Sequence, residues 1–267
     1  MDCWIVDAFT DAPFSGNQAA IVLLDPADAR AHDAEWMQGV ASDFNLAETA
    51  FLVPLGPNTY ALRWFTPAVE VVLCGHATLA SAHQLWITGR CTSNEIAFVT
   101  RQSGTLFARC TSGSDTVTIE LPADPPVPDP GPPGLAEAVG VTPTAIGRAR
   151  ENWLVEVATA DEVRKAEPDM RALAAMEGLG VILTGPGDGP YDTVSRYFVP
   201  SAGIDEDPVT GSAHCAIAPW WEERLGRTPL RCYQASKRGG EMVARVEGDR
   251  VLLEGRAITV MSGSLLS

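Results

Sequence analysis

The motif Arg-x-Phe-x-Pro occurs twice in this chain, and each copy precedes a glycine that marks a helix start. The first copy begins at Arg63 and leads to Gly75, and the second begins at Arg196 and leads to Gly211. Matching motifs in matching order indicate a duplicated fold. Such a fold tends to face its two equivalent helix starts across one cleft, where unpaired backbone N–H groups attract an anion.

Further elements repeat in the same order in the two halves. In each half a strand, a helix and an apolar strand precede the motif, and a strongly apolar helix follows it, at residues 76–87 and at residues 212–225 with Gly226 as its end. The sequence therefore predicts an α+β fold of two pseudo-symmetric lobes, each a curled, mostly antiparallel sheet or barrel around a central helix. The other expected elements are strands at residues 4–10, 49–53, 96–99, 104–110 and 116–121, their counterparts at 153–159, 180–184, 242–246, 250–253 and 257–261, and helices at 33–42 and 169–177.

A proline-rich segment at residues 121–134 lies near the middle of the chain. Proline lacks the backbone N–H and restricts the residue before it, so this segment cannot form a helix or the interior of a strand. We expect an extended connector and a domain boundary. The predicted lobes are residues 1–121 and 122–267, with the connector at 122–134 and a last strand that can cross back to the N-terminal lobe.

Composition and charge narrow the class of protein. Hydrophobic residues make up 46% of the 267 residues and charged residues 20%, which favours folded cores, and the net charge of −15 disfavours nucleic acids and anionic membranes as partners. The six cysteines have no C-x-x-C spacing, and we find neither a signal peptide nor a membrane-spanning stretch. We expect free thiols in the cytoplasm and no membrane or nucleic-acid partner.

His76 follows Gly75 at the first helix start. Its imidazole is able to titrate near neutral pH and to hold or protonate a substrate oxygen beside the helix N–H groups. The alternative is a capping or core histidine, which is the commoner role of a lone histidine. The paired context of the two helix starts favours the functional interpretation.

Asp207 precedes a proline at the second helix start, so its backbone is extended and it does not simply continue into the helix. Thr210 then supplies a hydroxyl, Gly211 allows a ligand to approach the backbone closely, and Ser212 begins the helix. The alternatives are an ordinary turn with a capping Ser or Thr, or a solvated acidic loop.

Glu48 lies at the start of an apolar strand, and the matching stretch of the second half, residues 178–180, contains no acid. The scaffold is thus symmetric, whereas this carboxylate belongs to one half only. A half-buried carboxylate suits a general base or acid; a solvent-facing glutamate is the alternative.

Other chemistries are disfavoured. His76 and His83 are seven residues apart, too far for joint metal ligation, and no zinc-binding motif occurs, so we expect no metal. The glycine-rich residues 184–190 are interrupted by prolines and are not followed by a helix, which excludes a nucleotide-binding loop. There is also no G-x-S-x-G elbow of a serine hydrolase.

These residues together resemble the PhzF-like isomerase family of phenazine biosynthesis, over nearly the whole chain. The matching stretches are Asp7-Ala8-Phe9-Thr10, Phe14-Ser15-Gly16-Asn17, Asn45-Leu46-Ala47-Glu48-Thr49, Phe65-Thr66-Pro67, Cys74-Gly75-His76-Ala77-Thr78-Leu79, Glu206-Asp207-Pro208-Val209-Thr210-Gly211-Ser212-Ala213, Gln234-Ala235-Ser236 and Arg238-Gly239-Gly240.

The resemblance implies a diaminopimelate-epimerase-type fold, a homodimer and an isomerase without a cofactor. In the phenazine enzyme a glutamate moves a proton on a dihydro-hydroxyanthranilate ring, helped by a histidine and an aspartate. These catalytic roles carry over to Glu48, His76 and Asp207. The substrate, expected to be a small carboxylate held between the lobes, would be bound by Asn17, Gly75, Ala77, Thr210, Gly211 and Ser212.

The motif Cys74-Gly75-His76 differs from that of the phenazine branch and is similar to that of the broader, mostly uncharacterised branch of the family. Related diaminopimelate epimerases use two opposed cysteine bases. Counting back from Thr210, we expect Pro208 at the second cysteine's place, and one thiol cannot supply a base on each face of a carbon. An isomerase is therefore favoured. A racemase or epimerase of an amino or hydroxy acid, and a non-catalytic metabolite-binding or interaction module, are the alternatives.

Overall fold

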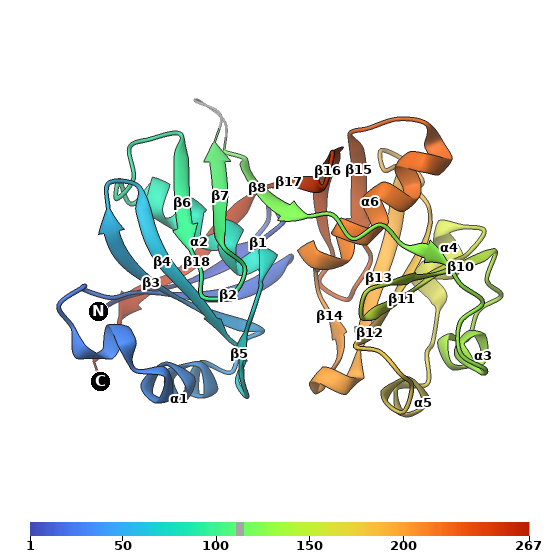
Figure 1. Ribbon diagram of the computed structural model, residues 1–267, viewed down its shortest axis with the longest axis horizontal. Helices are drawn as coiled ribbons and strands as arrows, with labels where there is room; N and C mark the ends of the chain where they lie inside the picture. The colour runs from blue at the N-terminus through green and yellow to red at the C-terminus, as the bar shows by residue number, and fades with distance from the viewer. Residues whose placement is uncertain (111–114, 267) are drawn as a thin grey trace. The chain divides into compact units, whose positions relative to one another are not determined.

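The computed structural model describes residues 1–110 and 115–266. The chain forms two compact units (Figure 1): unit 1 comprises Met1–Glu120 and Glu254–Ser267, and unit 2 comprises Leu121–Leu253. Each unit is an α+β structure with a curled, mostly antiparallel sheet and a buried helix, so the predicted fold class is confirmed.

The sheet of unit 1 has the pairing order β18-β1-β2-β3-β4-β6-β7-β8, with the short strand β5 also paired to β4. The pairs β2–β3 and β4–β6 are parallel and the others are antiparallel. The strands are β1 (Asp2–Ala8), β2 (Asn17–Leu23), β3 (Glu48–Gly56), β4 (Thr59–Phe65), β5 (Glu70–Val71), β6 (Glu95–Val99), β7 (Thr105–Cys110), β8 (Val117–Pro122) and β18 (Ala257–Ser264).

Unit 2 repeats this pattern with the order β9-β10-β11-β12-β13-β15-β16 and the short strand β14 on β13. Again two pairs, β11–β12 and β13–β15, are parallel. The same succession of antiparallel and parallel pairs supports the duplication inferred from the sequence. The strands are β9 (Val127–Pro128), β10 (Ala145–Ala149), β11 (Asn152–Glu156), β12 (Gly180–Pro186), β13 (Thr193–Val199), β14 (Ile204–Asp207), β15 (Leu230–Gln234), β16 (Gly240–Glu247) and β17 (Arg250–Gly255).

One buried helix serves each sheet: α2 (Gly75–Ile87) in unit 1 and α6 (Gly211–Leu225) in unit 2. Helix α2 packs against β1, β2 and β3. In unit 2 the indole of Trp221 in α6 donates a hydrogen bond of 2.9 Å to the hydroxyl of Thr184 in β12. The left-handed Gly226, with φ at 64°, ends α6 as expected.

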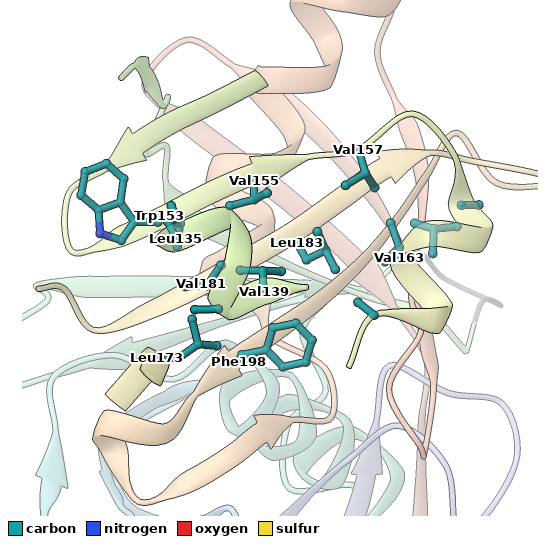
Figure 2. Packing of buried hydrophobic residues seen from close by; sticks show 14 residues of the cluster. Leu135, Val139, Trp153, Val155, Val157, Val163, Leu173, Val181, Leu183 and Phe198 are labelled. Atoms are coloured by element: carbon teal, nitrogen blue, oxygen red, sulfur yellow. The ribbon is translucent and has the colours of Figure 1, made fainter. Parts of the chain in front are cut away.

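Shorter helices cover the other face of each sheet. In unit 1, α1 (Ala34–Phe44) packs against β3 and β4, after the 3₁₀ turn η1 (Ala29–His32). In unit 2, α3 (Leu135–Val139), α4 (Ala160–Lys165) and α5 (Met170–Ala174) are followed by the 3₁₀ turn η2 (Pro200–Ala202). Figure 2 shows the apolar side chains of α3, α4 and α5 packed against those of β11, β12 and β13 in unit 2.

The structure corrects two expectations about local structure. Within the proline-rich connector, Val127–Pro128 forms the short strand β9 on β10; proline is tolerated there because an edge strand leaves some N–H positions unpaired. The acidic segment before α6 is the strand β14 and not a loop, and its residue Glu206 lies opposite Phe198 in β13.

The repeated Arg-x-Phe-x-Pro motif has the same structural role in both units. Arg63 donates from Nε and Nη2 to both carboxylate oxygens of Glu70, at 2.7 and 2.8 Å, and stacks 5.0 Å from the ring centre of Phe65. Arg196 makes the same contacts with Glu206 and Phe198. A fork between guanidinium and carboxylate fixes the short strand that leads into each buried helix.

Among residues 1–110 and 115–266, no helix is long and apolar enough to cross a membrane.

Candidate active site

Glu48 and His76 form an ion pair in unit 1. Nε2 of His76 lies 3.1 Å from Oε2 of Glu48, and Nδ1 of the same ring lies 3.2 Å from the side-chain nitrogen of Asn17. The side chain of Glu48 is 18% exposed, whereas His76 and Asn17 are buried. The carboxylate thus connects a buried imidazole to the surface of the unit.

Local backbone geometry places each of these side chains. Asn45, in the left-handed conformation, ends α1 and redirects the chain so that Glu48 begins β3. Gly16 has φ at +67°, and a Cβ there would lie 2.2 Å from the carbonyl oxygen of Ala8. Only glycine fits this turn, which delivers Asn17 to the start of β2.

The charge state of the His76 imidazole results from opposing effects. Burial lowers its pKa, but negative charge on Cys74 or Glu48 and hydrogen bonds to them raise it, and the net pKa lies well above 6.5. Burial and the charge of Glu48 raise the pKa of the Cys74 thiol, so this thiol is neutral near pH 7. Because the thiol is neutral, the charge of Glu48 is the contribution that favours the protonated imidazole.

Cys74 lies close to the same ring, with its sulfur 3.5 Å from Nδ1 of His76. Glu48, Cys74 and His76 each offer one donor atom, and these atoms lie within 4.8 Å of one another, close enough to share a cation. Nδ1 faces the amide nitrogen of Asn17 and Nε2 faces the carboxylate of Glu48, so a cation bound to the ring would have to displace one of these contacts. The absence of a metal therefore stays a prediction.

In unit 2 the structure brings the predicted residues around the start of α6 together. Asp207 ends β14 and is 8% exposed, and its Oδ2 accepts a hydrogen bond from the hydroxyl of Thr210. Thr210 is the N-cap residue of α6, and Gly211 and Ser212 are the first residues of the helix.

Sequence reasoning gave no role to Gln234, the last residue of β15. Its carboxamide is 1% exposed and bonds both ends of the turn before α6, accepting from the backbone N–H of Thr210 and donating to the backbone oxygen of Asp207, each at 2.8 Å. Gln234 lies 24 residues beyond Thr210 in the chain, and no local sequence pattern indicates this contact.

Both buried helices begin without a side-chain cap. Neither Cys74 at α2 nor Thr210 at α6 caps its helix, whereas Asp33, Thr159 and Asp169 cap α1, α4 and α5. An uncapped helix start keeps N–H groups available for an anionic ligand. The interpretation of Thr210 as an ordinary capping residue is therefore wrong.

The equivalence of the helix starts also corrects the position assigned to the second cysteine. In both units the helix begins five residues after the glutamate of the Arg–Glu fork, since Glu70 leads to Gly75 and Glu206 leads to Gly211. The counterpart of Cys74 is thus Thr210 and not Pro208. With a threonine at this position, Cys74 is the one cysteine at the two equivalent helix starts.

Within unit 1 the structure places Asn17 and Glu48 on His76, in the first turn of α2 with Gly75 and Ala77. Within unit 2 it places Asp207 beside Thr210, Gly211 and Ser212. The catalytic and binding roles of these nine residues stay predictions.

Known proteins match this chain over nearly all of its length. The chain is similar to an uncharacterized isomerase of Halalkalibacterium halodurans, at 41% identity over 98% of this chain and 97% of that protein. It is also similar to the crystal structure of a phenazine biosynthesis protein of the PhzF family from Enterococcus faecalis, with a TM-score of 0.92, 37% identity and 99% coverage of both chains.

A more distant solved structure, a probable proline racemase from Agrobacterium radiobacter, matches with a TM-score of 0.64 at 11% identity over 99% of this chain and 92% of that chain, which shows a shared fold. The sequence profile of the phenazine biosynthesis-like proteins, PhzC-PhzF, matches residues 6–263. The chain therefore belongs to the PhzC-PhzF family of phenazine biosynthesis-like proteins.

Proposed function

We propose that this protein is a cofactor-independent isomerase that moves a proton within a small carboxylated substrate. The observation that carries the proposal is the Glu48–His76 pair, in which Nε2 and Oε2 lie 3.1 Å apart. A carboxylate that is 18% exposed and bonded to a buried imidazole is able to exchange a proton with a bound ligand.

Glu48 would act as the proton carrier. Its carboxylate takes a proton from one substrate atom, and the resulting carboxylic acid returns it to another, so that the substrate keeps its composition and its electron count. Protonated His76 stabilises negative charge that develops on the substrate. Because no electrons are gained or lost, the reaction needs no redox cofactor.

The helix starts would hold the substrate. Within the part of the chain that the structure describes, the N–H groups of Gly211 and Ser212 at the start of α6 have no acceptor, and such groups bind a carboxylate well at the positive end of a helix dipole. Asp207 would hold or donate a proton at a polar substrate atom. In unit 1, Asn17, Gly75 and Ala77 beside His76 are the proposed substrate-binding residues.

Relatives support the reaction class. Bacterial relatives that are 41–43% identical over 97–98% of the chain are described as uncharacterized isomerases. The six free cysteines fit the reducing cytoplasm that we propose as the location. The proposed homodimer is tested by measuring the mass in solution by light scattering.

An epimerase is the second candidate, because Cys74 lies at a helix start beside His76. Two-base inversion at carbon requires a base on each side, and the counterpart of Cys74 in α6 is Thr210, whose hydroxyl is a far weaker base than a thiolate. Deuterium uptake distinguishes a dihydro-hydroxyanthranilate from other small acids as the substrate.

The experiment follows deuterium uptake in D₂O. The protein is incubated with dihydro-hydroxyanthranilate and with a panel of small amino and hydroxy acids, and deuterium at carbon is measured by NMR and mass spectrometry. We expect uptake together with a shifted double bond, and a loss of about 10²–10⁴-fold in Glu48→Gln. Glu95→Gln is the control, because Glu95 also begins a strand of unit 1 but its side chain is 49% exposed.

Uptake in Glu48→Gln at the rate of the unmodified protein would refute the role of Glu48. Uptake with inversion of one centre and no bond shift would establish the epimerase instead. Ligands that raise the melting temperature without any deuterium uptake would indicate a non-catalytic binding protein.

A further inference from the structure

Gln234 makes a set of hydrogen bonds that controls the start of α6. Besides its bonds to the backbone of Asp207 and Thr210, its Nε2 donates to the hydroxyl oxygen of Thr210 at 3.2 Å. The same hydroxyl donates its own proton to Oδ2 of Asp207. Thr210 is therefore engaged on both sides by groups outside its helix.

A threonine at a helix start ordinarily caps the helix. Thr159 does so in this protein, since its hydroxyl accepts a hydrogen bond from the backbone N–H of Glu162 at the start of α4. Thr210 holds the equivalent position on α6 without capping it. The two hydroxyls differ in their partners. The hydroxyl of Thr159 bonds to Glu162, whereas the hydroxyl of Thr210 accepts a hydrogen bond from the buried carboxamide of Gln234.

The consequence is a set of uncommitted donors at α6. Among the described residues, the N–H groups of Gly211, Ser212 and Ala213 have no hydrogen-bond acceptor, and the first helical bond runs from His214 to the carbonyl of Thr210. If the Thr210 hydroxyl rotated to cap the helix, it would accept from Ser212 or Ala213 and occupy this donor set.

We propose that Gln234 is a positioning residue that prevents Thr210 from capping α6 and so keeps the first N–H groups of the helix available for the substrate carboxylate. The inference rests on the proposed function, in which α6 holds that carboxylate. Gln234 also binds the carbonyl of Asp207, the residue proposed to hold or donate a proton at the substrate.

A neighbouring contact supports this role. Ser236, two residues after Gln234, donates from its hydroxyl to the backbone oxygen of Pro208 at 2.7 Å and accepts from the backbone N–H of Gly239 at 3.1 Å. Gln234 at the end of β15 and Ser236 after it thus bind the successive backbone carbonyl groups of Asp207 and Pro208. Gln234→Met removes three hydrogen bonds of the turn and leaves the bond from Ser236, whereas Gln234→Glu also keeps an acceptor for the Thr210 N–H, so the two variants together separate the effect on the Thr210 hydroxyl from a loss of the turn.

The test uses the full chain, with sodium acetate as the carboxylate probe. Amide chemical shifts and hydrogen exchange of Gly211, Ser212 and Ala213 are followed by NMR in the unmodified protein, in Gln234→Met and in Gln84→Met. Gln84 is the matched control: it is 2% exposed and accepts from the Thr259 hydroxyl in unit 1 at 2.7 Å. Gln234→Glu is the second variant, since its carboxylate accepts from the Thr210 N–H but lacks the donor to the hydroxyl.

We expect Gln234→Met to bind acetate about five- to tenfold more weakly and to slow hydrogen exchange at Ser212 or Ala213, because Thr210 now caps the helix. Adding Thr210→Val should restore both properties, since valine cannot cap. A loss equal to that in Gln84→Met, or unchanged exchange with no rescue by Thr210→Val, would overturn the proposal. None of these measurements needs turnover, so they succeed or fail independently of deuterium uptake and of Glu48.

Discussion

Arg196 and Glu206 are joined by two parallel hydrogen bonds, from Nε to Oε1 at 2.8 Å and from Nη2 to Oε2 at 2.9 Å. Their side chains are 14% and 19% exposed, and Arg196 also donates to the backbone oxygen of Ala166. Because Glu206 directly precedes Asp207, these two hydrogen bonds also fix the backbone position of Asp207, the proposed acid.

Replacing Arg196 by methionine should therefore lower the free energy of unfolding by about 1–3 kcal/mol, since it leaves a largely buried carboxylate without its partner. Urea unfolding measures the change. Arg101→Met is the control, because Arg101 is 57% exposed and lies 3.6 Å from Glu70, and a change within about 0.5 kcal/mol is expected there. Equal effects in both variants would show that the fork is an ordinary surface pair.

The proton on His76 should depend on Glu48. Since the carboxylate raises the pKa of the imidazole, Glu48→Gln should lower the pKa of His76, which NMR titration of labelled histidine measures directly. The raised pKa stabilises the folded state fully below pH 6.5, the value of the unfolded chain, and this contribution is lost as the pH rises through the folded value. An unchanged His76 pKa in Glu48→Gln would contradict the pairing.

His214 should make the protein sensitive to mild acid. Burial lowers its pKa from 6.5 to about 4. Between these two values His214 is protonated in the unfolded chain but neutral in the folded chain, so stability is lost as the pH falls through 6.5 toward 4. At pH 5 the loss is about 2 kcal/mol relative to pH 8.

Urea unfolding between pH 8 and pH 5 tests this expectation. His214→Asn should show a flatter dependence on pH, even if its stability at pH 8 is lower. His32→Asn serves as the control because His32 is exposed in η1. The same slope in His214→Asn as in the unmodified protein would show that other groups account for the acid sensitivity.

Cys74 should be dispensable for proton transfer. The thiol is 6% exposed and burial raises its pKa, so it is a poor base near pH 7. Cys74→Ser should keep activity within about tenfold, whereas loss of a catalytic base costs about 10²–10⁴-fold. A loss of the larger size, measured as deuterium uptake, would favour the epimerase reaction.

The sequence was sufficient to predict the elements that repeat. The helix starts at Gly75 and Gly211 and the end at Gly226 depend on local rules of glycine and helix termini, and the structure confirms them to within a residue. Helix α4 was missed although Thr159 and Glu162 form a capping box, a local signal that sequence carries.

Contacts between distant segments could not be predicted in the same way. The Arg63–Glu70 fork explains the repeated motif, but the motif alone did not indicate which carboxylate the arginine holds. Gln234 belongs to a family-like stretch, and only the parallel pairing of β13 with β15 places it beside the α6 turn. Such contacts are identified from the pairing of the strands, because the distance along the chain does not indicate which residues are neighbours in space.

The return of β18 to unit 1 has a consequence for how the chain folds during synthesis. Strand β1 pairs with β2 on one side and with β18 on the other, and the backbones of Met1 and Leu265 are hydrogen-bonded. All of unit 2 is therefore synthesised before the last neighbour of β1 emerges from the ribosome. Until then, β1 keeps an open edge, which is a site for mispairing with other nascent chains.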